Sequence, residues 1–272
     1  MEDSGKKEDA PAIKGRQVVA LESRLKGCKN VITLGVKPNF SDYSEEEARL
    51  ILESPRVYYP SAFYADILDA IGVNIFPSRH TYHFAQDKIM QTAIFQALKI
   101  PHPRTHIYYG ATQQKRILDD FKFPFIAKVP RGSSQGKGVF LIQSELGLKA
   151  YLGLVHAAYI QELIPGERDI RVVVVGEKPI LAYWRVAAKG SFMTNIAQGG
   201  KRDFAAIPYN SMALATETAT KCGFDDVGID IRIGPDGPMV LEANMKYGRD
   251  AFKEAGLEYK DFIEACLEKG II

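Results

Sequence analysis

Between residues 159 and 244 the sequence consists mainly of short strand-forming runs separated by tight turns. "DIRVVVV" and "ILAYWRVA" flank "GEKP", and "VGIDIRI" and "PMVLEANM" flank "GPDG". Strands joined by so few residues can pair only antiparallel, because a parallel pair needs a crossover of a dozen residues or more. We therefore predict antiparallel hairpins here, covered by helices at about 211–222 and 259–269.

The first 80 residues follow a different pattern. Residues 1–15 are polar and mixed in charge, and we expect a mobile tail there. "NVITLGV" predicts a strand, and "SEEEARLILES" predicts a helix that starts with the capping-box pair Ser44 and Glu47. "SAFYADILDAIG" predicts a second helix that ends at Gly72, and "NIFPS" predicts a short strand. Residues 16–80 are therefore expected to form a small α/β domain.

The central part of the chain combines helices and strands. "HFAQDKIMQTAIFQALKI" has apolar residues at roughly helical spacing and predicts one helix, which "IPHP" stops. "RTHIYYG" predicts a strand and "TQQKRILDDF" a helix. "FPFIAKV" and "GVFLI" then predict two strands joined by a glycine-rich loop.

The composition excludes several classes of protein. A chain of 272 residues that is 46% hydrophobic and 25% charged is an ordinary globular protein, long enough for about two domains. Lys and Arg number 35 against 33 Asp and Glu, so no overall basic field favours nucleic acid or a membrane surface as a partner. Cys28, Cys222 and Cys266 show no CxxC spacing, and no apolar run approaches the about 20 residues of a membrane span. We expect a cytoplasmic protein without zinc or disulfides.

The glycine-rich loop does not match the common nucleotide motifs. Lys137 is followed by Gly138 rather than by the Ser or Thr of a Walker A loop, and Leu141 stands where a dinucleotide fingerprint needs its third glycine. Protein kinases place the glycine loop before the strand lysine, whereas Lys128 precedes this loop. These three motifs are therefore excluded.

The residue types of the loop still suit an anionic ligand. Small residues let backbone N–H groups approach a ligand closely, and Lys128 and Arg131 add positive charge, so a polyphosphate would be held here. The alternative is an exposed hairpin with ordinary surface cations. The loop residues concerned are Gly132, Ser133, Gly136, Lys137 and Gly138.

The "GPDG" hairpin carries two carboxylates. A turn centred on Asp236 would place Asp230 opposite Glu242 and Gly228 opposite Asn244. Facing carboxylates are destabilising unless neutralised, and with an amide oxygen they are the hard ligands that Mg²⁺ prefers. We therefore predict a metal site at Asp230, Glu242 and Asn244, and expect the metal-free protein to be no less stable without the Glu242 charge. The alternative is a one-residue register shift that separates the side chains.

The "GEKP" hairpin carries two cations. A turn about Lys178 would place Arg171 opposite Arg185. Adjacent guanidinium groups are best tolerated with an anion or a carboxylate between them. We expect either a bound anion or, in a purely structural version, the carboxylate of Asp169.

In their order along the chain, these segments resemble the ATP-grasp superfamily and, within it, the RimK-like ligases. The resemblance covers residues 81–272 and rests on "QDK", "PFIAKVPRGSSQGKGVFLI", "YIQELIPGERDIRVVVVGE", "RVAAKGSFMTNIAQGG", "VGIDI" and "LEAN". It implies an α+β fold in which two α/β lobes with antiparallel sheets grip ATP, preceded by the small domain. The lid lobe would span about 104–158 and the carboxyl-terminal lobe about 159–272.

The resemblance also implies a function. Relatives transfer the γ-phosphate of ATP to a carboxylate, and an amine attacks the acyl phosphate to form an amide. It implies ATP and Mg²⁺, or Mn²⁺ in its place, and as partners an amine and a small-molecule or peptide carboxylate, with the oligomeric state open. The further residues implied are Lys88 with Lys128 at the phosphates, Glu162 and Leu163 at the adenine, Asp169 at the ribose, Asn195 near the nucleotide, and Arg185 and Arg171 at the acyl phosphate.

Two rival functions stay open beside this hypothesis. One is a non-catalytic ATP-binding module on the same fold, and the other is a hairpin that binds Ca²⁺ for structure only. The sequence also departs from its relatives, since residues 245–248 read Met-Lys-Tyr-Gly where many have Ser-Pro-Gly after "LEAN". Gln198 likewise stands where a basic residue is common. Both departures concern the acceptor substrate.

Overall fold

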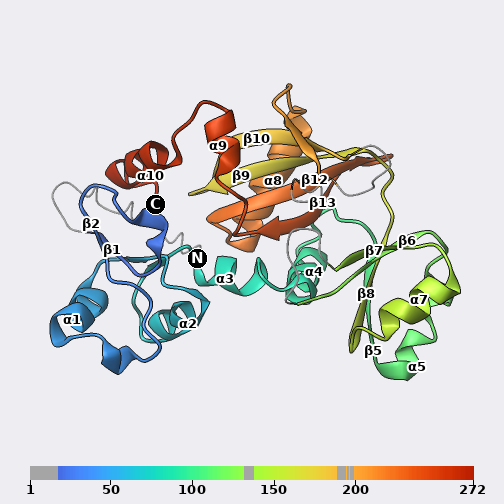
Figure 1. The fold of residues 1–272 in the computed structure, drawn as a ribbon, viewed down its shortest axis with the longest axis horizontal. Coiled ribbons are helices and arrows are strands. Elements are labelled where there is room, and N and C mark those ends of the chain that lie inside the picture. Colours follow the sequence, from blue (N-terminus) through green and yellow to red (C-terminus); the bar gives the residue numbers. More distant parts are fainter. Residues whose placement is uncertain (1–17, 132–137, 189–193, 195, 197–198) are drawn as a thin grey trace, which may run out of the picture. The chain divides into compact units, whose positions relative to one another are not determined.

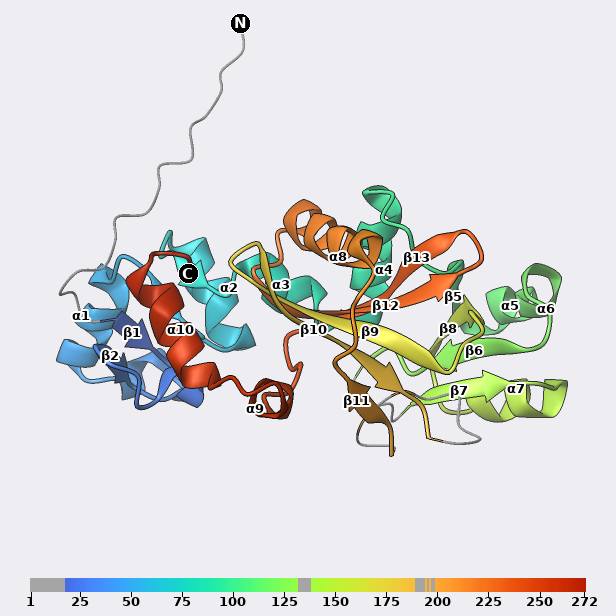
Figure 2. The same cartoon turned by 90° about the horizontal axis from the view of Figure 1, so that it is seen from above.

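The structure is a computed structural model, and it describes residues 18–131, 138–188, 194, 196 and 199–272 (Figures 1 and 2). The chain forms two compact units, of which the first comprises residues 1–79 and 249–272 and the second residues 80–248. The division into domains at 16–80 and 81–272 remains a prediction. The compact units differ from it in one respect, because residues 249–272 group with the amino-terminal residues.

The first unit is built on a parallel sheet in the order β2-β1-β3-β4. The strands are β1 (Val18–Ala20), β2 (Val31–Thr33), β3 (Val57–Tyr58) and β4 (Ile75–Phe76). The helices are α1 (Glu45–Glu53), α2 (Ala62–Ala70), α9 (Asp250–Glu254) and α10 (Tyr259–Glu268), with 3-10 turns η1 (Ser23–Leu25) and η2 (Phe40–Asp42). The alternation of strands and helices agrees with the α/β pattern of the sequence.

Local signals at the helix ends of this unit are confirmed. Ser44 accepts a hydrogen bond from the backbone N–H of Glu47, and the Glu47 carboxylate accepts one from the N–H of Ser44, which completes the predicted capping box. Gly72 has a φ of +82° just after α2, a conformation that favours glycine. Strands β1 and β3 were not predicted, whereas β2 and β4, which are equally short, were.

The second unit contains two antiparallel sheets. The five-stranded sheet has the order β11-β10-β9-β12-β13, and the four-stranded sheet has the order β5-β8-β6-β7. The first comprises β9 (Arg168–Val175), β10 (Lys178–Val186), β11 (Lys201–Asp203), β12 (Asp226–Gly234) and β13 (Gly237–Asn244). The second comprises β5 (Thr105–Tyr109), β6 (Phe125–Lys128), β7 (Val139–Ile142) and β8 (Ala157–Glu162). The predicted hairpins are thus confirmed.

Helices cover these sheets. Helix α8 (Tyr209–Cys222) packs against β9, β10, β12 and β13, as both views show (Figures 1 and 2). All of β9 after Arg168 is buried, because this strand lies between β10 and β12 near the centre of the sheet. The four-stranded sheet has its own core, formed with α6 (Ile117–Asp120) and α7 (Glu145–Leu152) around Tyr108 and Phe125. Among the described helices, none combines the length and the apolar character that a membrane crossing requires.

Two predicted helices are each divided in the structure. The single helix expected from "HFAQDKIMQTAIFQALKI", residues 83–100, is interrupted, because its first two residues end α3 (Arg79–Phe84) and a separate helix, α4, spans Lys88–Ala97. The break occurs because the Asp87 side chain accepts hydrogen bonds from the backbone N–H groups of Ile89 and Met90, and so starts a new helix. The helix expected from "TQQKRILDDF" is likewise divided into α5 (Gly110–Gln114) and α6.

Candidate functional site

A pocket in the second unit is lined by residues from both sheets. Strands β6, β7 and β8 contribute from the four-stranded sheet, and β9, β10, β12 and β13 contribute from the five-stranded sheet. The predicted site residues that line it are Lys128, Glu162, Leu163, Asp169, Arg185, Asp230 and Glu242. The chain therefore brings together side chains that are up to 114 positions apart, from Lys128 to Glu242.

The β12–β13 hairpin has the predicted pairing at its functional end. Asp230 lies opposite Glu242, and Gly228 lies opposite Asn244. The turn itself is not centred on Asp236, since Gly234 pairs with Gly237 and Ile231 pairs with Val240. A register shift next to Asp230 leaves one extra residue, Leu241, on β13. This β-bulge moves the opposite partner of Asp230 from Leu241 to Glu242.

The β9–β10 hairpin differs from its prediction. Arg171 lies opposite Tyr183, and Arg185 lies opposite Asp169, so the two arginines do not face each other directly. The turn is formed by Gly176 and Glu177, which have φ values of +54° and +66°. Positive φ at both central residues is typical of a two-residue type I′ turn, which is tighter than the turn expected about Lys178.

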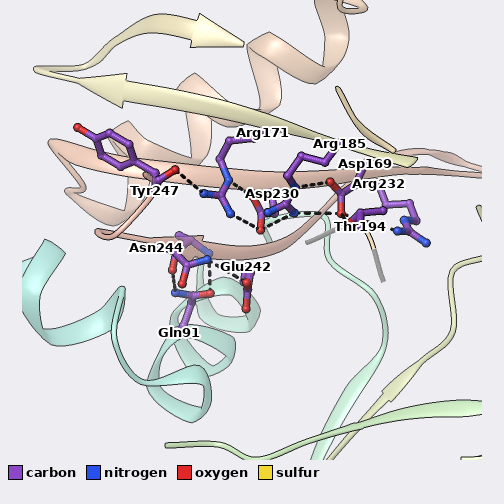
Figure 3. Close-up of polar contacts among 11 residues, drawn as sticks. Gln91, Asp169, Arg171, Arg185, Thr194, Asp230, Arg232, Glu242, Asn244 and Tyr247 are labelled. Carbon is purple, nitrogen blue, oxygen red and sulfur yellow. Dashed lines mark hydrogen bonds and ion pairs between the residues drawn. The ribbon is translucent and has the colours of Figure 1, made fainter. Parts of the chain in front are cut away.

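The two arginines nevertheless share a carboxylate, which is that of Asp230 (Figure 3). Arg171 donates from Nε to Oδ1 and from Nη2 to Oδ2, the latter at 2.8 Å. Arg185 Nη2 lies 2.8 Å from the same Oδ2 atom. Pairing of β9 with β12 places Arg171 directly opposite Asp230. A carboxylate does lie between the two arginines, but it is that of Asp230 and not that of Asp169, which binds Arg185.

Asp169 completes this buried network. It accepts hydrogen bonds from Arg185 Nε at 2.7 Å and Nη2 at 3.0 Å, and from the Thr194 hydroxyl. Burial alone would lower the pKa of Arg185, but Asp169 and Asp230 outweigh it and raise the pKa of this guanidinium. Burial raises the pKa of Asp230, and Arg171 and Arg185 oppose that rise. With these hydrogen bonds from Arg185 and Thr194, both carboxylate oxygens of Asp169 have protein partners.

Lys128 and Glu242 form the other charged part of the pocket. Lys128 is 7% exposed on β6, and its Nζ atom lies 5.6 Å from the ring centroid of Tyr159. Burial lowers the pKa of Lys128, whereas Glu242 and Asp230 act to raise it. Burial acts to raise the pKa of Glu242, but Lys128 and Lys88 outweigh it and hold that pKa at about 2. Glu242 is therefore an anion that two lysines stabilise.

Glu162 and Leu163 line the pocket where β8 ends. The Glu162 carboxylate accepts a hydrogen bond of 2.6 Å from the backbone N–H of Arg104, and the Glu162 N–H donates to the Arg104 carbonyl at 2.9 Å. These two bonds tie the end of β8 to the segment before β5. The backbone of Leu163 follows directly at the pocket wall.

The remaining predicted residues lie close to the pocket or outside the described residues. Lys88 is the first residue of α4, and Arg131 pairs from Nε with the Asp87 carboxylate at 2.6 Å. Gly138 has a φ of +83°, and its carbonyl accepts a 2.7 Å bond from the N–H of Val129. Gly132, Ser133, Gly136, Lys137 and Asn195 lie outside the described residues, so their predicted roles stay predictions.

Sequence reasoning missed Arg232, a further pocket residue on β12. Its Nη1 atom donates to the carbonyls of Ile164 at 3.2 Å and Gly166 at 2.9 Å. Its Nε atom is buried and has no hydrogen-bond partner among the described residues. Burial lowers the pKa of this guanidinium. Arg232 stands two positions after Asp230 on the same face of β12, and this period-2 spacing was the signal that could have identified it.

A second missed feature surrounds Gly228 and Tyr247. The Tyr247 hydroxyl donates to Asp226 at 2.7 Å, and its carbonyl accepts from Arg171 Nη1 at 3.4 Å. A Cβ atom on Gly228 would lie 2.5 Å from Cβ of Tyr247 and 2.9 Å from Cδ of Arg171. Tyr247 thus occupies space that only glycine leaves open at position 228. It belongs to the segment 245–248 that follows "LEAN".

The predicted metal ligands fit a divalent cation in part. Glu242 is ionised, and its Oε1 accepts a 2.9 Å bond from Asn244 Nδ2, so a carboxylate and an amide lie side by side. Asp230 is instead held by two arginines. Among the described residues, no group of three or more His, Cys, Asp and Glu side chains could hold an ion. Since Mg²⁺ often takes one or two carboxylates plus substrate phosphates, Glu242 and Asn244 suit it best.

Comparisons with known proteins agree with this architecture. A RimK domain ATP-grasp protein from Sphaerobacter thermophilus has a TM-score of 0.67 at 17% identity, over 92% of this chain and 98% of that one. The D-alanine–D-alanine ligase from Bacillus anthracis, solved with ATP, has a TM-score of 0.67 at 14% identity, over 94% of this chain and 97% of that one. These likenesses define the α+β fold as ATP-grasp, which confirms the predicted fold class.

Sequence comparisons specify the family. Residues 85–265 match the family model of the RimK-like ATP-grasp domain. A probable alpha-L-glutamate ligase from Shewanella loihica is 32% identical over 68% of this chain, and a second from Shewanella denitrificans is 32% identical over 80%. The chain belongs to the RimK-like ATP-grasp family. It spans 64% of the Shewanella loihica protein and 76% of the Shewanella denitrificans one.

Proposed function

We propose that this chain is an ATP-dependent carboxylate–amine ligase. In this reaction a substrate carboxylate oxygen attacks the γ-phosphorus of ATP, and the bond from that phosphorus to the β–γ bridging oxygen breaks. The amine then attacks the acyl carbon, phosphate leaves, and the amine proton is released as the amide forms. The observation that carries the proposal is the single pocket where Lys128, Arg185 and Glu242 meet within a RimK-like domain.

The cations of the pocket suit the charges that change in this reaction. Phosphoryl transfer needs positioning and charge neutralisation more than covalent help from the protein. Lys128, with Lys88 at the start of α4, is our candidate for the ATP phosphates. The glycine loop, with Arg131, is proposed to cover them.

Arg185 is the first candidate for the acyl phosphate. It lines the pocket, and its Nη1 atom makes no hydrogen bond to any residue that the structure describes. Arg171 is the second candidate, although its three nitrogens already contact Asp230 and Tyr247. Asp230, bound to both arginines, would hold them in their relative orientation.

The part of the pocket formed where β8 ends is proposed to bind the nucleoside. Glu162 and the backbone of Leu163 lie where a strand end exposes backbone groups, which suits the adenine edge. Asp169 is proposed for the ribose, although in this structure both of its oxygens bind protein groups. A divalent cation, proposed to be Mg²⁺ or Mn²⁺, would neutralise phosphate charge, with Glu242 and Asn244 as ligands. Asp230 would join that ligand set after giving up an arginine contact.

The names of the relatives suggest which substrates to test. Both Shewanella proteins are named as probable alpha-L-glutamate ligases, so we propose L-glutamate as one substrate and a peptide or small carboxylate as the other. Residues 245–248 differ from the Ser-Pro-Gly of many relatives, so the second substrate is proposed to be specific to this chain. We further propose that the protein acts in the cytoplasm.

The decisive experiment measures ADP release with Mg²⁺ and ATP across amino acids and short peptides, and L-glutamate is tested first. The product is then weighed by mass spectrometry. A mass gain equal to the amine substrate minus one water, together with one ADP per amide, is the expected result. ATP binding without any turnover across the panel would instead favour the non-catalytic module.

A further inference from the structure

Strand β13, which carries Glu242 and Asn244, is an edge strand of the five-stranded sheet. The backbone groups on the outer side of an edge strand have no neighbouring strand to bond. At Ala243, between the two predicted ligands, a side chain of α4 takes the place of that strand. The Ala243 N–H donates to Gln91 Oε1 at 2.8 Å, and Gln91 Nε2 donates to the Ala243 carbonyl at 2.9 Å (Figure 3).

A carboxamide suits this position because it carries the same donor and acceptor as a peptide group. Gln91 is 4% exposed, so water does not compete for these bonds. Its Nε2 atom also donates to the carbonyl of Phe84 at 3.2 Å, at the end of α3. This third hydrogen bond fixes the orientation of the Gln91 carboxamide, whose nitrogen therefore faces the Ala243 carbonyl.

The contact lies where it controls the orientation of both predicted ligands. Side chains alternate along a strand, so fixing the backbone at Ala243 sets the direction of Glu242 and Asn244, which emerge on the same face. The Glu242 carboxylate is bonded to Asn244 Nδ2 at 2.9 Å. On the other side of the bulge at Leu241, the Val240 N–H donates to the Pro101 carbonyl at 2.8 Å. The bulge is therefore held at both ends.

We propose that Gln91 is a positioning residue of the ligase site, which orients Glu242 and Asn244 by hydrogen bonding the edge of β13 between them. The proposal rests on the proposed function, because it assumes that these two residues hold the metal–nucleotide complex. Gln91 touches no substrate in this role. It acts through the strand, as outer partners of metal ligands commonly do.

The first test uses Gln91→Met, which keeps the length of the side chain and removes its hydrogen bonds. Mn²⁺ is titrated into the protein with a non-hydrolysable ATP analogue, and the free ion is followed by electron paramagnetic resonance. We expect Mn²⁺ to bind roughly 10- to 100-fold more weakly than in the wild type, which is the usual effect of losing an outer partner. Gln96→Met is the matched control, since Gln96 lies on α4 but donates to the Thr105 carbonyl.

A second variant separates orientation from charge. Gln91→Glu adds a negative charge near the site, which by electrostatics alone would strengthen cation binding. It also replaces the amide donor by an oxygen that faces the Ala243 carbonyl, so the positioning role predicts weaker Mn²⁺ binding instead. Weaker Mn²⁺ binding by Gln91→Glu, together with wild-type Mn²⁺ binding by Gln96→Met, supports the proposal.

Other results would overturn the proposed positioning role of Gln91. If the wild type binds the Mn²⁺–nucleotide complex and Gln91→Met binds it equally well, Gln91 does not position the ligands, and the ligase proposal is untouched. If the wild type binds no such complex, the proposed function itself fails. Loss of folding in both Gln91 variants, seen as absent cooperative melting, would show that Gln91 serves only the stability of the fold.

Discussion

At the scale of single residues, Asp230 and Glu242 face each other across a hairpin but differ in their neighbours. Asp230 accepts hydrogen bonds from Arg171 and forms an ion pair with Arg185, both of them buried, whereas Glu242 lies in the field of two lysines. Each carboxylate is thus neutralised separately, by groups from other strands and from α4. The repulsion expected between them from the sequence is therefore not the dominant interaction at this site.

A prediction follows for Glu242→Gln, and it reverses the expectation drawn from the sequence. The folded-state pKa of Glu242 is about 2, below its ordinary value of 4.5. A depressed carboxyl pKa stabilises the folded state above the unfolded pKa, and this contribution is lost as the pH falls from about 4.5 through about 2. We expect the metal-free variant to be about 1–3 kcal/mol less stable at pH 7, with a smaller difference at pH 3.

Urea unfolding at pH 7 and pH 3 provides this measurement. Glu217→Gln is the control, because Glu217 forms an exposed pair with Lys221 and should change stability by less than about 0.5 kcal/mol. Equal stability of Glu242→Gln and the wild type at pH 7 would restore the view that Asp230 and Glu242 repel each other.

A second prediction concerns Gly228→Ala. The added Cβ would lie 2.5 Å from Cβ of Tyr247 and 2.9 Å from Cδ of Arg171, so one of them must move. Overpacking of this kind costs about 1–3 kcal/mol of unfolding free energy. Displacement of Arg171 from Asp230 should also weaken binding of an ATP analogue, measured by calorimetric titration.

The matched control for that variant is Gly147→Ala in α7. Its nearest atom would be Ser144 Oγ at 3.6 Å, an ordinary contact distance. Alanine favours helix, so this variant should be as stable as the wild type or slightly more stable. If both variants unfold alike, the close contact at Gly228 has no energetic consequence.

At the scale of secondary-structure elements, local signals predicted the strands better than their registers. The β9–β10 register differs from the predicted one by two residues at Arg185, because Gly176 and Glu177 form a tighter turn and an irregularity between Pro179 and Leu181 offsets its effect by one residue. The β12–β13 pairing at Asp230 is correct although the turn centre was not, because the bulge at Leu241 compensates. Turn type and bulges depend on backbone conformations that residue patterns signal only weakly.

Helix α4 gives the element-scale prediction. Asp87 Oδ1 accepts from the N–H groups of Ile89 and Met90, while Oδ2 binds Arg131, which is 73% exposed. Asp87→Ala removes the cap and should lower the unfolding free energy by about 1 kcal/mol. Asp87→Asn keeps a capping oxygen and should leave stability nearly unchanged, because an exposed ion pair contributes little. Equal losses in the two variants, measured by urea unfolding, would assign the effect to the charge.

At the scale of the whole molecule, the sequence indicated most of the charged residues that line the pocket but not how they pair. Consecutive strands were paired correctly from their turns, and the motif order indicated the family. The central contact between Arg171 and Asp230 depends instead on β9 pairing with β12, strands separated by 50 residues of chain. Such non-local pairing leaves no local pattern. For the same reason Gln91, on a helix far from Ala243 in sequence, was not predicted.

The last prediction treats Lys128 and Glu242 as a pair that joins the four-stranded sheet to the five-stranded sheet. Lys128 is buried and Glu242 is half-buried, so removing either charge leaves the other poorly compensated, and Lys128→Met and Glu242→Gln should each destabilise the metal-free protein. The double variant removes both charges, so its loss of stability should be smaller than the sum of the two single losses by about 0.5–3 kcal/mol.

Melting curves with and without Mg²⁺ and an ATP analogue add the functional readout, because a ligand that binds only the folded state raises the melting temperature. That ligand-induced rise should be strongly reduced in all three variants, including the double variant whose fold is restored. Additive losses would show that the two charges are not coupled across the pocket, and a full ligand-induced rise in Lys128→Met would remove Lys128 from the nucleotide site.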